Sequence, residues 1–429
     1  MRTRFSISPS EHFEEKLLHF LDQQAFSFCF KGKGWGNQND FQFEVFAGFG
    51  IKTSVDEFNP EGLAKLVNDS KDFIVSHLSY DVKNRLEKLQ SENQDGIDFP
   101  ELKYTIPQVV FLKKSSQWQA LFHTTDFTQN EITSVIKSVE NTIVKQEYSI
   151  GKQQSRLTKQ EYLSAMNSLQ QHLQRGDIYQ ANYCQEFYWE NTQVSPADLF
   201  WKGFSQNPNP FSVFYKIKEK RCISFSPERF IAASGKTLVS QPMKGTAARG
   251  ANENEDQTQI DFLKSSEKDR RENVMIVDMV RNDLSHFAAK GSVKVPELYR
   301  IETYPKVHQM YSTVTAELNH KNQLNDALLK CFPMGSMTGA PKVRAMQIIE
   351  SLEHTKRGLF SGTIGFFTPN GQADFNVIIR SLLYDEQTHY LSCHVGGGIT
   401  ILSDREAEYE ECLVKFKPIQ QLIASIAGD

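Results

Sequence analysis

The chain has 429 residues, with 48 basic and 52 acidic side chains and a formal net charge of −4. This near balance argues against a broad basic surface for nucleic acid and against an acidic disordered chain. No apolar run approaches the roughly 20 residues needed to cross a bilayer, and the N-terminus lacks the apolar segment of a signal peptide. The composition predicts a cytoplasmic globular protein that binds neither nucleic acid nor membrane.

Two polar stretches, 91–101 and 149–155, are predicted to be connections between structured parts. The second divides the chain into an N-terminal region (residues 1–150) and a C-terminal region (residues 151–429). Aromatic and β-branched residues at 41–46 predict a strand in the N-terminal region. We expect this region to be a β-rich support, because it holds no cluster of catalytic residue types.

Start signals place helices in the C-terminal region. Thr158 and Glu161 form a capping-box pair, and Gly176 is expected to end the helix that they open. A second helix is predicted from Asp269 to about Asp283.

A third helix is predicted from Ser403, with Glu406 as its capping partner, to about residue 416. Pro341 stands at the start of a fourth apolar-periodic stretch, while 311–314 and 377–379 are strand-like. Because helices and strands alternate without a regular parallel-sheet rhythm, the fold class is predicted to be α+β.

Two of these helices carry paired carboxylates. Asp269 and Glu272 share one helix face, as do Glu408 and Glu411, and Lys415 lies one turn further along. A solvated acidic face explains either pair alone. If the two faces converge, their oxygen atoms could hold a hard cation such as Mg²⁺.

Two glycine-rich stretches are candidates for anion binding. The first, residues 335–342, leads into a helix whose N-terminal N–H groups, with the hydroxyls of Ser336 and Thr338, could bind a carboxylate or phosphate. The triple glycine at 396–398 permits close approach of a ligand, although a bulge explains it equally well. Arg380 could bind a carboxylate through two hydrogen bonds, but such a residue is also common on surfaces.

Taken together, the motifs resemble those of the chorismate-utilising enzymes over roughly residues 156–420. The motifs, in chain order, are Gly176-Asp-Ile-Tyr-Gln180, Ser226-Pro-Glu228, Pro242-Met-Lys-Gly-Thr246, Lys268-Asp-Arg-Arg-Glu-Asn273, Val277-Asp-Met-Val-Arg-Asn-Asp283, Gly335-Ser-Met-Thr-Gly-Ala-Pro-Lys342, Gly396-Gly-Gly-Ile399 and Glu406-Ala-Glu-Tyr-Glu-Glu411. The resemblance implies an α+β fold with two large antiparallel β-sheets packed face to face and helices outside.

The resemblance also implies a set of binding residues. Mg²⁺ would bind the ring carboxylate of chorismate, with Glu272 and Glu411 as direct ligands and Asp269 and Glu408 assisting through water. The substrate carboxylates would be held by Gly245, Thr246, Arg380, Gly396, Gly398 and Lys415. Thr338 would lie close to the substrate.

Two positions distinguish branches of the family. Members that add water carry a lysine where this chain has Gln180, and glutamine cannot act as that base. Anthranilate synthases usually carry alanine where this chain has Lys244, and aminodeoxychorismate synthases usually carry lysine. The pattern therefore resembles aminodeoxychorismate synthase component I, an enzyme of 4-aminobenzoate and folate synthesis.

The chemistry gives Lys244 and Glu228 roles. An uncharged Lys244 amine would attack C2 of chorismate while Glu228 protonates the departing 4-hydroxyl group, and ammonia would then displace the lysine. Without the motif, an ordinary surface lysine would explain Lys244. His308 matches a family active-site histidine, although a structural hydrogen bond explains it equally well.

Departures from the family pattern and the source of ammonia complete the prediction. Ala247 and Ala248 follow Thr246 where an arginine is usual, Met334 replaces a common glycine, and Phe360 replaces a tyrosine that touches substrate. None of the six cysteines lies in a glutaminase motif, so we expect a separate glutaminase subunit to supply ammonia. The alternatives are anthranilate synthase component I and a non-catalytic chorismate-binding regulatory subunit.

Overall fold

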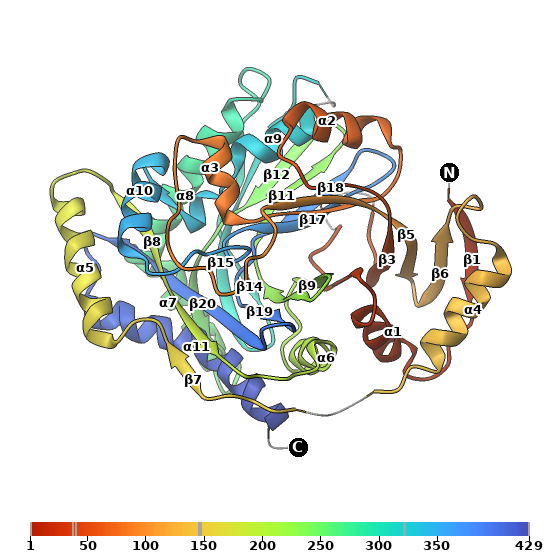
Figure 1. Cartoon of the computed structure of the whole chain (residues 1–429). Coiled ribbons are helices and arrows are strands. Elements are labelled where there is room, and N and C mark those ends of the chain that lie inside the picture. The colour runs from red at the N-terminus through yellow and green to blue at the C-terminus, as the bar shows by residue number, and fades with distance from the viewer. Residues whose placement is uncertain (1, 37, 39–40, 145–147, 321–322, 428–429) are drawn as a thin grey trace.

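A computed structural model describes residues 2–36, 38, 41–144, 148–320 and 323–427 of the chain (Figure 1). Its helices are α1 Phe13–Asp22, α2 Pro60–Asp69, α3 Lys83–Leu86, α4 Gln129–Glu140, α5 Lys159–Gln174, α6 Pro196–Gln206, α7 Glu253–Ser265, α8 Glu267–Ser285, α9 Leu324–Cys331, α10 Lys342–Leu352 and α11 Arg405–Ala427, with 3₁₀ turns η1 Tyr80–Val82 and η3 Gly335–Met337. Within these residues, no helix is both long and apolar enough to cross a membrane.

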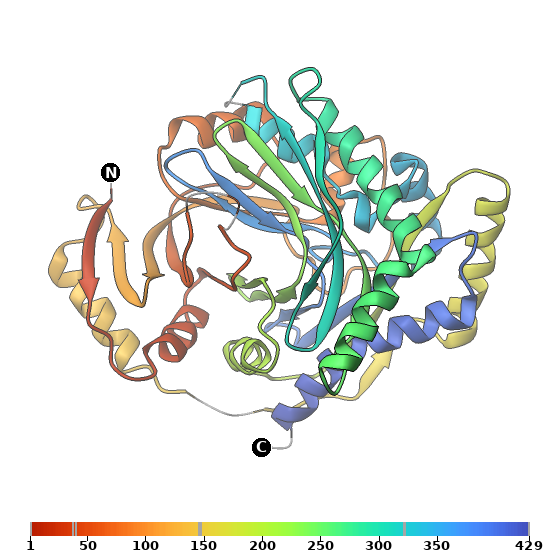
Figure 2. The ribbon, with the colours of Figure 1, turned by 180° about the vertical axis from the view of Figure 1, so that it is seen from behind.

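The strands are β1 Thr3–Ile7, β2 Phe26–Lys31, β3 Val45–Val55, β4 Ile74–Leu78, β5 Leu102–Lys114, β6 Gln117–Phe122, β7 Gln153–Ser155, β8 Gln180–Trp189, β9 Phe211–Ile217, β10 Lys220–Ser226, β11 Arg229–Ser234, β12 Thr237–Gln241, β13 Met243–Ala248, β14 Lys294–Thr303, β15 Val307–Glu317, β16 Gly339–Ala340, β17 Thr363–Phe367, β18 Ala373–Asn376, β19 Ser381–Asp385 and β20 Tyr390–Thr400. Strands pair in antiparallel fashion, and helices lie around them (Figures 1 and 2). The predicted α+β class is confirmed.

The strands of the N-terminal region join those of the C-terminal region. Strand β2 pairs with β9 in antiparallel register, and β4 pairs in the same way with β17. Hydrogen bonds thereby connect strands from both sides of the 149–155 stretch into one network. Part of that stretch, Gln153–Ser155, is itself a strand, β7, and pairs with β8.

Helix α5 begins as its sequence predicts. The Thr158 side chain accepts a hydrogen bond from Glu161 N, and the Glu161 carboxylate accepts one from Thr158 N at 2.8 Å. The buried residues Tyr162, Met166, Leu169 and Leu173 lie on one face of the helix. Gly176 follows the helix with a φ of 79°, a conformation that favours glycine.

The predicted start of the 403–416 helix is wrong by two residues and its end by eleven, because α11 spans Arg405–Ala427. Ser403 instead accepts a hydrogen bond from Thr400 N at 3.1 Å, and the Asp404 side chain accepts one from Ala407 N at 2.9 Å. Pro418 lies inside the helix, where it removes one backbone hydrogen bond without ending it.

Two strand predictions also need correction. The strand expected at 41–46 begins only at Val45. The run 377–379 is a connection between β18 and β19, because its N–H groups bond to separate segments instead of one partner strand. Val377 N donates to Glu228 O at 3.0 Å and Ile378 N to Gly362 O at 2.8 Å.

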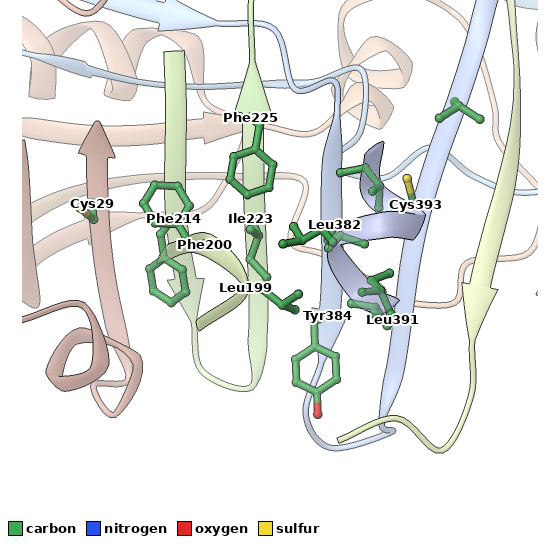
Figure 3. Close-up of a cluster of buried hydrophobic side chains, with 14 of the residues drawn as sticks. Cys29, Leu199, Phe200, Phe214, Ile223, Phe225, Leu382, Tyr384, Leu391 and Cys393 are labelled. Atoms are coloured by element: carbon green, nitrogen blue, oxygen red, sulfur yellow. The ribbon is translucent and has the colours of Figure 1, made fainter. Parts of the chain in front are cut away.

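A hydrophobic core supports the strands that lead to the candidate site. Figure 3 shows part of it, where Phe200 of α6 lies near Phe214 of β9 and Phe225 of β10. The rings of Phe200 and Phe225 are stacked with centroids 5.9 Å apart. Phe225 N donates to Arg380 O at 3.0 Å, so this packing also fixes the backbone of Arg380.

Candidate active site

A cavity of about 470 Å³ lies at the junction of β13, β15, β20, η3, α8 and α11. This volume is within the range of small-molecule sites, roughly 300–1,000 Å³. Helix α8 packs on β13 and β15, and α11 packs on β20. Of the residues predicted from the sequence, the cavity is lined by Glu228, Lys244, Gly245, Thr246, Asp269, Glu272, Arg380, Gly396, Gly398, Glu411 and Lys415.

Lys244 extends from β13 toward the glycine strand β20. A Cβ atom at Gly398 would lie 2.9 Å from Lys244 Nζ and 2.5 Å from Gln180 Nε2. The same position would be 3.6 Å from Glu272 Oε2. Gly398 therefore leaves the space in which the lysine amine, the glutamine amide and the glutamate carboxylate meet, and any larger residue would displace them.

Glu228 lies in the turn after β10 and is 5% exposed. Its backbone is fixed because Glu228 N donates to Ser226 Oγ at 3.2 Å and Glu228 O accepts from Val377 N. Burial raises the pKa of Glu228 to about 7, although Ser336 and Lys244 oppose the shift. A carboxyl group with this pKa can donate a proton near neutral pH.

Arg380 follows the 377–379 connection and has a φ of 52°. Burial lowers the pKa of its guanidinium from the ordinary value, and no carboxylate in the described part of the chain offsets this effect. Within the described residues, Arg380 has no ion pair. A guanidinium in this state can bind an incoming carboxylate through two parallel hydrogen bonds.

The acidic faces of α8 and α11 meet beside the glycine strand. Burial raises the pKa of Glu272, and the nearby Glu408 and Glu411 add to the shift. Burial alone would raise the pKa of Glu411, but Lys415 at 2.8 Å, together with Lys268 and Lys244, brings it below its ordinary value. The two helices thus bring three glutamates into one electrostatic cluster.

These carboxylates fit a divalent cation in donor chemistry. Glu272 Oε1 is buried and has no hydrogen-bond partner among the described residues. Such an oxygen is costly unless a further group binds it. Within the same residues, no three acidic, histidine or cysteine side chains already surround a point as ligands would. The set therefore offers oxygen atoms suited to Mg²⁺ and would have to close around the ion.

Three of the predicted site residues, Glu408, Thr338 and His308, do not line the cavity. Glu408 lies behind Gly397, where a Cβ atom would be 3.2 Å from its Oε2. Thr338 is buried, and its hydroxyl donates to Met334 O at 3.2 Å. This hydrogen bond stabilises the conformation of the glycine-rich loop. In the same loop, the Ser336 side chain lines the cavity, and its hydrogen bond to Glu228 lowers the pKa of that carboxyl group.

His308 points away from the cavity. Its neighbours on β15, Val307 and Gln309, line the cavity, and successive strand side chains point to opposite faces. His308 Nε2 lies 3.0 Å from an Asp256 carboxylate oxygen, and Nδ1 lies 2.9 Å from the Thr303 hydroxyl. These contacts are those of a structural histidine beneath the cavity wall.

The sequence motifs did not single out several cavity residues. Asn182, Gln309 and His394 line the cavity, and His394 stacks on Phe360 with ring centroids 5.2 Å apart. Strand alternation was the available signal for His394, since it precedes Gly396 and Gly398 by two and four residues on β20. Lys268, which adjoins Asp269 in a motif, also lines the cavity.

Comparison with known proteins defines the class to which this fold and cavity belong. The sequence profile of the chorismate binding enzymes matches residues 27–421. The chain therefore belongs to the chorismate binding enzyme family.

Individual relatives differ in activity. Aminodeoxychorismate synthase component 1 of Escherichia coli (strain K12) is 40% identical over 62% of this chain and 58% of its own length. Anthranilate synthase component 1 of Aquifex aeolicus (strain VF5) is 29% identical over 82% of this chain and 74% of its own. The chain thus spans less than two thirds of the length of the first of these relatives.

Solved structures establish the fold but not the reaction. The menaquinone-specific isochorismate synthase of Escherichia coli superposes with a TM-score of 0.77, covering 98% of this chain and 94% of its own, at 16% sequence identity. An identity this low supports shared architecture alone, because one fold carries different chemistries.

Proposed function

We propose that the chain is the synthase component that converts chorismate and ammonia to 4-amino-4-deoxychorismate. The observation that carries this proposal is a single cavity lined by Lys244, Glu228 and Arg380. The 40% identity to an aminodeoxychorismate synthase component 1 supports the same reaction. Gln180 near Lys244 disfavours hydration, since a neutral amide cannot remove a proton from water.

In the first step, Lys244 Nζ forms a bond to C2 of chorismate. The electrons of the C1–C2 double bond move to C1–C6, those of C5–C6 move to C4–C5, and the C4–oxygen bond breaks. Glu228 gives its proton to the departing hydroxyl, which leaves as water, and the lysine nitrogen loses a proton. The raised pKa of Glu228, about 7, keeps part of the group protonated at neutral pH.

In the second step, ammonia forms a bond to C4 and the same electron shifts run in reverse. The bond between C2 and Lys244 breaks, the lysine nitrogen regains a proton, and the added nitrogen loses one. The net change replaces the 4-hydroxyl of chorismate by an amino group and releases water. Arg380 and Lys415 would bind substrate carboxylates in both steps, because they line the cavity and carry positive charge.

A divalent cation belongs to the proposal. Glu272 and Glu411 would bind Mg²⁺ directly, and Asp269 and Glu408 would assist through water. The ion would supply positive charge for the ring carboxylate when bound. Support comes from the unpartnered, buried Glu272 Oε1.

Ammonia would come from a separate glutaminase subunit. All six cysteines of the chain are buried. Burial raises the pKa of every one of these thiols, and it raises the pKa of Cys29 to about 12. A glutaminase nucleophile needs an accessible thiolate, so these thiols are unsuited to that chemistry.

Product analysis tests the reaction. The purified chain is incubated with chorismate, ammonium and Mg²⁺, with and without an added aminodeoxychorismate lyase. We expect 4-aminobenzoate only when the lyase is present. Anthranilate, detected by its fluorescence without the lyase, would contradict the proposal in favour of the tryptophan-pathway reaction, and absence of turnover even with a glutaminase subunit would favour a regulatory protein.

Covalent capture tests the role of Lys244. After mixing with chorismate and without ammonium, intact-mass spectrometry should show an adduct equal to chorismate minus water, and peptide mapping should place it on Lys244. Lys244→Ala should show none. The exposed Lys290 is a matched control, so Lys290→Ala should be modified as the unaltered chain is. A fully active, adduct-free Lys244→Ala chain would exclude the covalent step.

A further inference from the structure

Lys268 forms an ion-pair link between the two acidic helices. It lies one turn before Glu272 on α8, on the same helix face. Its Nζ is 3.2 Å from Glu408 Oε1 and 4.0 Å from Glu411 Oε2, and both of these carboxylates belong to α11. Burial lowers the pKa of Lys268, but Glu408, Glu272 and Glu411 outweigh that effect and raise it above its ordinary value.

We propose that Lys268 is a positioning residue that competes with the divalent cation for the carboxylates of α11. This inference rests on the metal site of the proposed function. Without the ion, the Lys268 ammonium offsets repulsion among Glu272, Glu408 and Glu411 and keeps α8 against α11. When the ion binds the same carboxylates, the ammonium either leaves them or repels the ion.

The contacts of the neighbouring cations explain why Lys268 has this role. Lys415 donates to Gly396 O at 2.8 Å and pairs with Glu411 at 2.8 Å, so the backbone of β20 anchors it. Within the described residues, Lys268 makes no backbone contact of this kind, and its side chain is 51% exposed. It can therefore turn toward solvent while the carboxylates close around an ion. Arg271, three residues further along α8, pairs instead with Glu267 on the surface.

The competition between Lys268 and the divalent cation determines whether the cation or the substrate binds first. A monovalent and a divalent cation about 5 Å apart repel by an amount worth roughly a tenfold change in affinity, even with water-like screening. The empty protein should therefore bind the ion weakly. A substrate carboxylate in the cavity adds negative charge and shifts the balance toward the ion.

Binding of Mn²⁺ without substrate tests the inference directly. Free Mn²⁺ is measured by electron paramagnetic resonance during titration of the full chain and its variants. Lys268→Met should bind Mn²⁺ about tenfold more tightly than the unaltered chain, and Lys268→Arg should stay within about twofold of it. Arg271→Met removes the same charge from the same helix and should also stay within about twofold.

Several results would overturn the inference. One is equal or weaker Mn²⁺ binding by Lys268→Met, and another is equal tightening by Arg271→Met, since that would be a net-charge effect. Adding Glu272→Gln to Lys268→Met should abolish the gain, and its persistence would place the ion elsewhere. Product formation in the assay above, with no change in Mn²⁺ affinity, would leave the proposed function standing and this inference refuted.

Thermal unfolding separates competition from a purely structural link. Without metal, Lys268→Met should unfold at a lower temperature than the unaltered chain, because three glutamates lose a counter-charge. Added Mg²⁺ should raise its Tm by more than it raises that of the unaltered chain. A lower Tm that Mg²⁺ raises only to the same extent would indicate a structural link alone and would contradict the inference.

Discussion

The aromatic core around Trp35 and the cavity around Lys244 each contain an arginine. The arginine in the core has an ion-pair partner, and the arginine in the cavity has none within the described residues. Arg229 packs over Phe211, whose ring faces Trp35, and its guanidinium donates to both carboxylate oxygens of Asp374 at 2.9 and 3.0 Å. Arg380 lines the cavity and has no ion pair within the described residues. The charge of Arg229 is therefore neutralised by Asp374 within the core, whereas the charge of Arg380 remains available to a ligand in the cavity.

Because of this difference, substitutions of the two arginines should affect stability and function separately. Removing one partner of a buried ion pair leaves the other charge without compensation and costs folding free energy. Removing an unpaired cavity charge, such as that of Arg380, relieves a strain that the folded protein carries in the absence of ligand. Substitutions of a paired core charge should therefore lower Tm, whereas substitution of the unpaired Arg380 in the cavity should change kinetics without lowering Tm.

The largest effect is expected for Lys244→Ala. Loss of the nucleophile should lower kcat for 4-amino-4-deoxychorismate formation by roughly 10³-fold or more, since no other cavity residue supplies an equivalent amine at that point. Tm should fall by less than it does for a core ion pair, because Lys244 makes no ion pair within the described residues and Glu272 and Glu411 lose only a nearby positive charge. Steady-state assays and calorimetry check both halves. A fall in Tm with preserved kcat would break the distinction between cavity and core.

Arg229→Met is the matched change in the core. It leaves Asp374, which is 0% exposed, without its counter-charge and removes the hydrogen bond to Gly34 O. The free energy of unfolding should fall by about 3–5 kcal/mol, measured by chemical denaturation. The KM of whatever variant remains folded should stay near that of the unaltered chain. The double variant Arg229→Met/Asp374→Leu should recover part of the loss, and failure to do so would argue against an uncompensated charge as the cause.

The contribution of Glu228 to the free energy of unfolding depends on pH. Its pKa is about 7 in the folded chain, above the ordinary 4.5, so the folded state is favoured while the carboxyl is protonated. That contribution is fully present below about pH 4.5 and is lost as the pH rises through about 7. Glutamine imitates the protonated form, so at pH 8 Glu228→Gln should be more stable by up to about 3 kcal/mol.

The same pKa governs activity. In the unaltered chain, kcat should fall as the pH rises above about 7, because the proton donor ionises. Glu228→Gln should lose roughly 10²- to 10⁴-fold in kcat. Unfolding and kinetics measured from pH 5 to 8 check both statements. Equal stability of the two chains at pH 8 would show that burial does not strain this carboxyl group.

Arg380→Met tests the available guanidinium itself. We expect KM for chorismate to rise by about 10²-fold through loss of a charged carboxylate contact. Tm should be unchanged or higher, because burial disfavours the charged guanidinium. Arg380→Lys should recover part of the affinity but not the bidentate geometry. A drop in Tm comparable to that of Arg229→Met would remove the contrast between the two arginines.

The motifs predicted much of the cavity because family chemistry requires particular residue types at particular places. Lys244, Glu228 and Arg380 come from three separate segments and line one cavity. The motifs contain Lys244 and Glu228, and the family resemblance implied Arg380 as a site residue. The direction of a side chain was harder to predict. His308 matches a site residue by position, yet its ring contacts Asp256 and Thr303, because the alternation of β15 turns Val307 and Gln309 to the cavity.

Local signals predicted elements well where they acted alone and failed where tertiary contacts competed. Thr158 and Glu161 bond reciprocally as predicted. Ser403 shows the same spacing to Glu406, but its hydroxyl accepts from Thr400 N, so Asp404 caps the helix. The run 377–379 has strand composition, yet its N–H groups are taken by separate segments.

The smallest expected effect lies outside both regions, at the start of α5. Thr158→Ala removes one side of the capping box and should lower the free energy of unfolding by about 1 kcal/mol, with kcat and KM unchanged. Thr128, which caps α4 through the same exchange with Glu131, is a matched control in the N-terminal region. Thr128→Ala should cost a similar amount, and the two losses should add, because distant sites are independent. A change in KM for Thr158→Ala would mean that α5 transmits strain to the cavity, and the division between stability and function would then not hold for the outer helices.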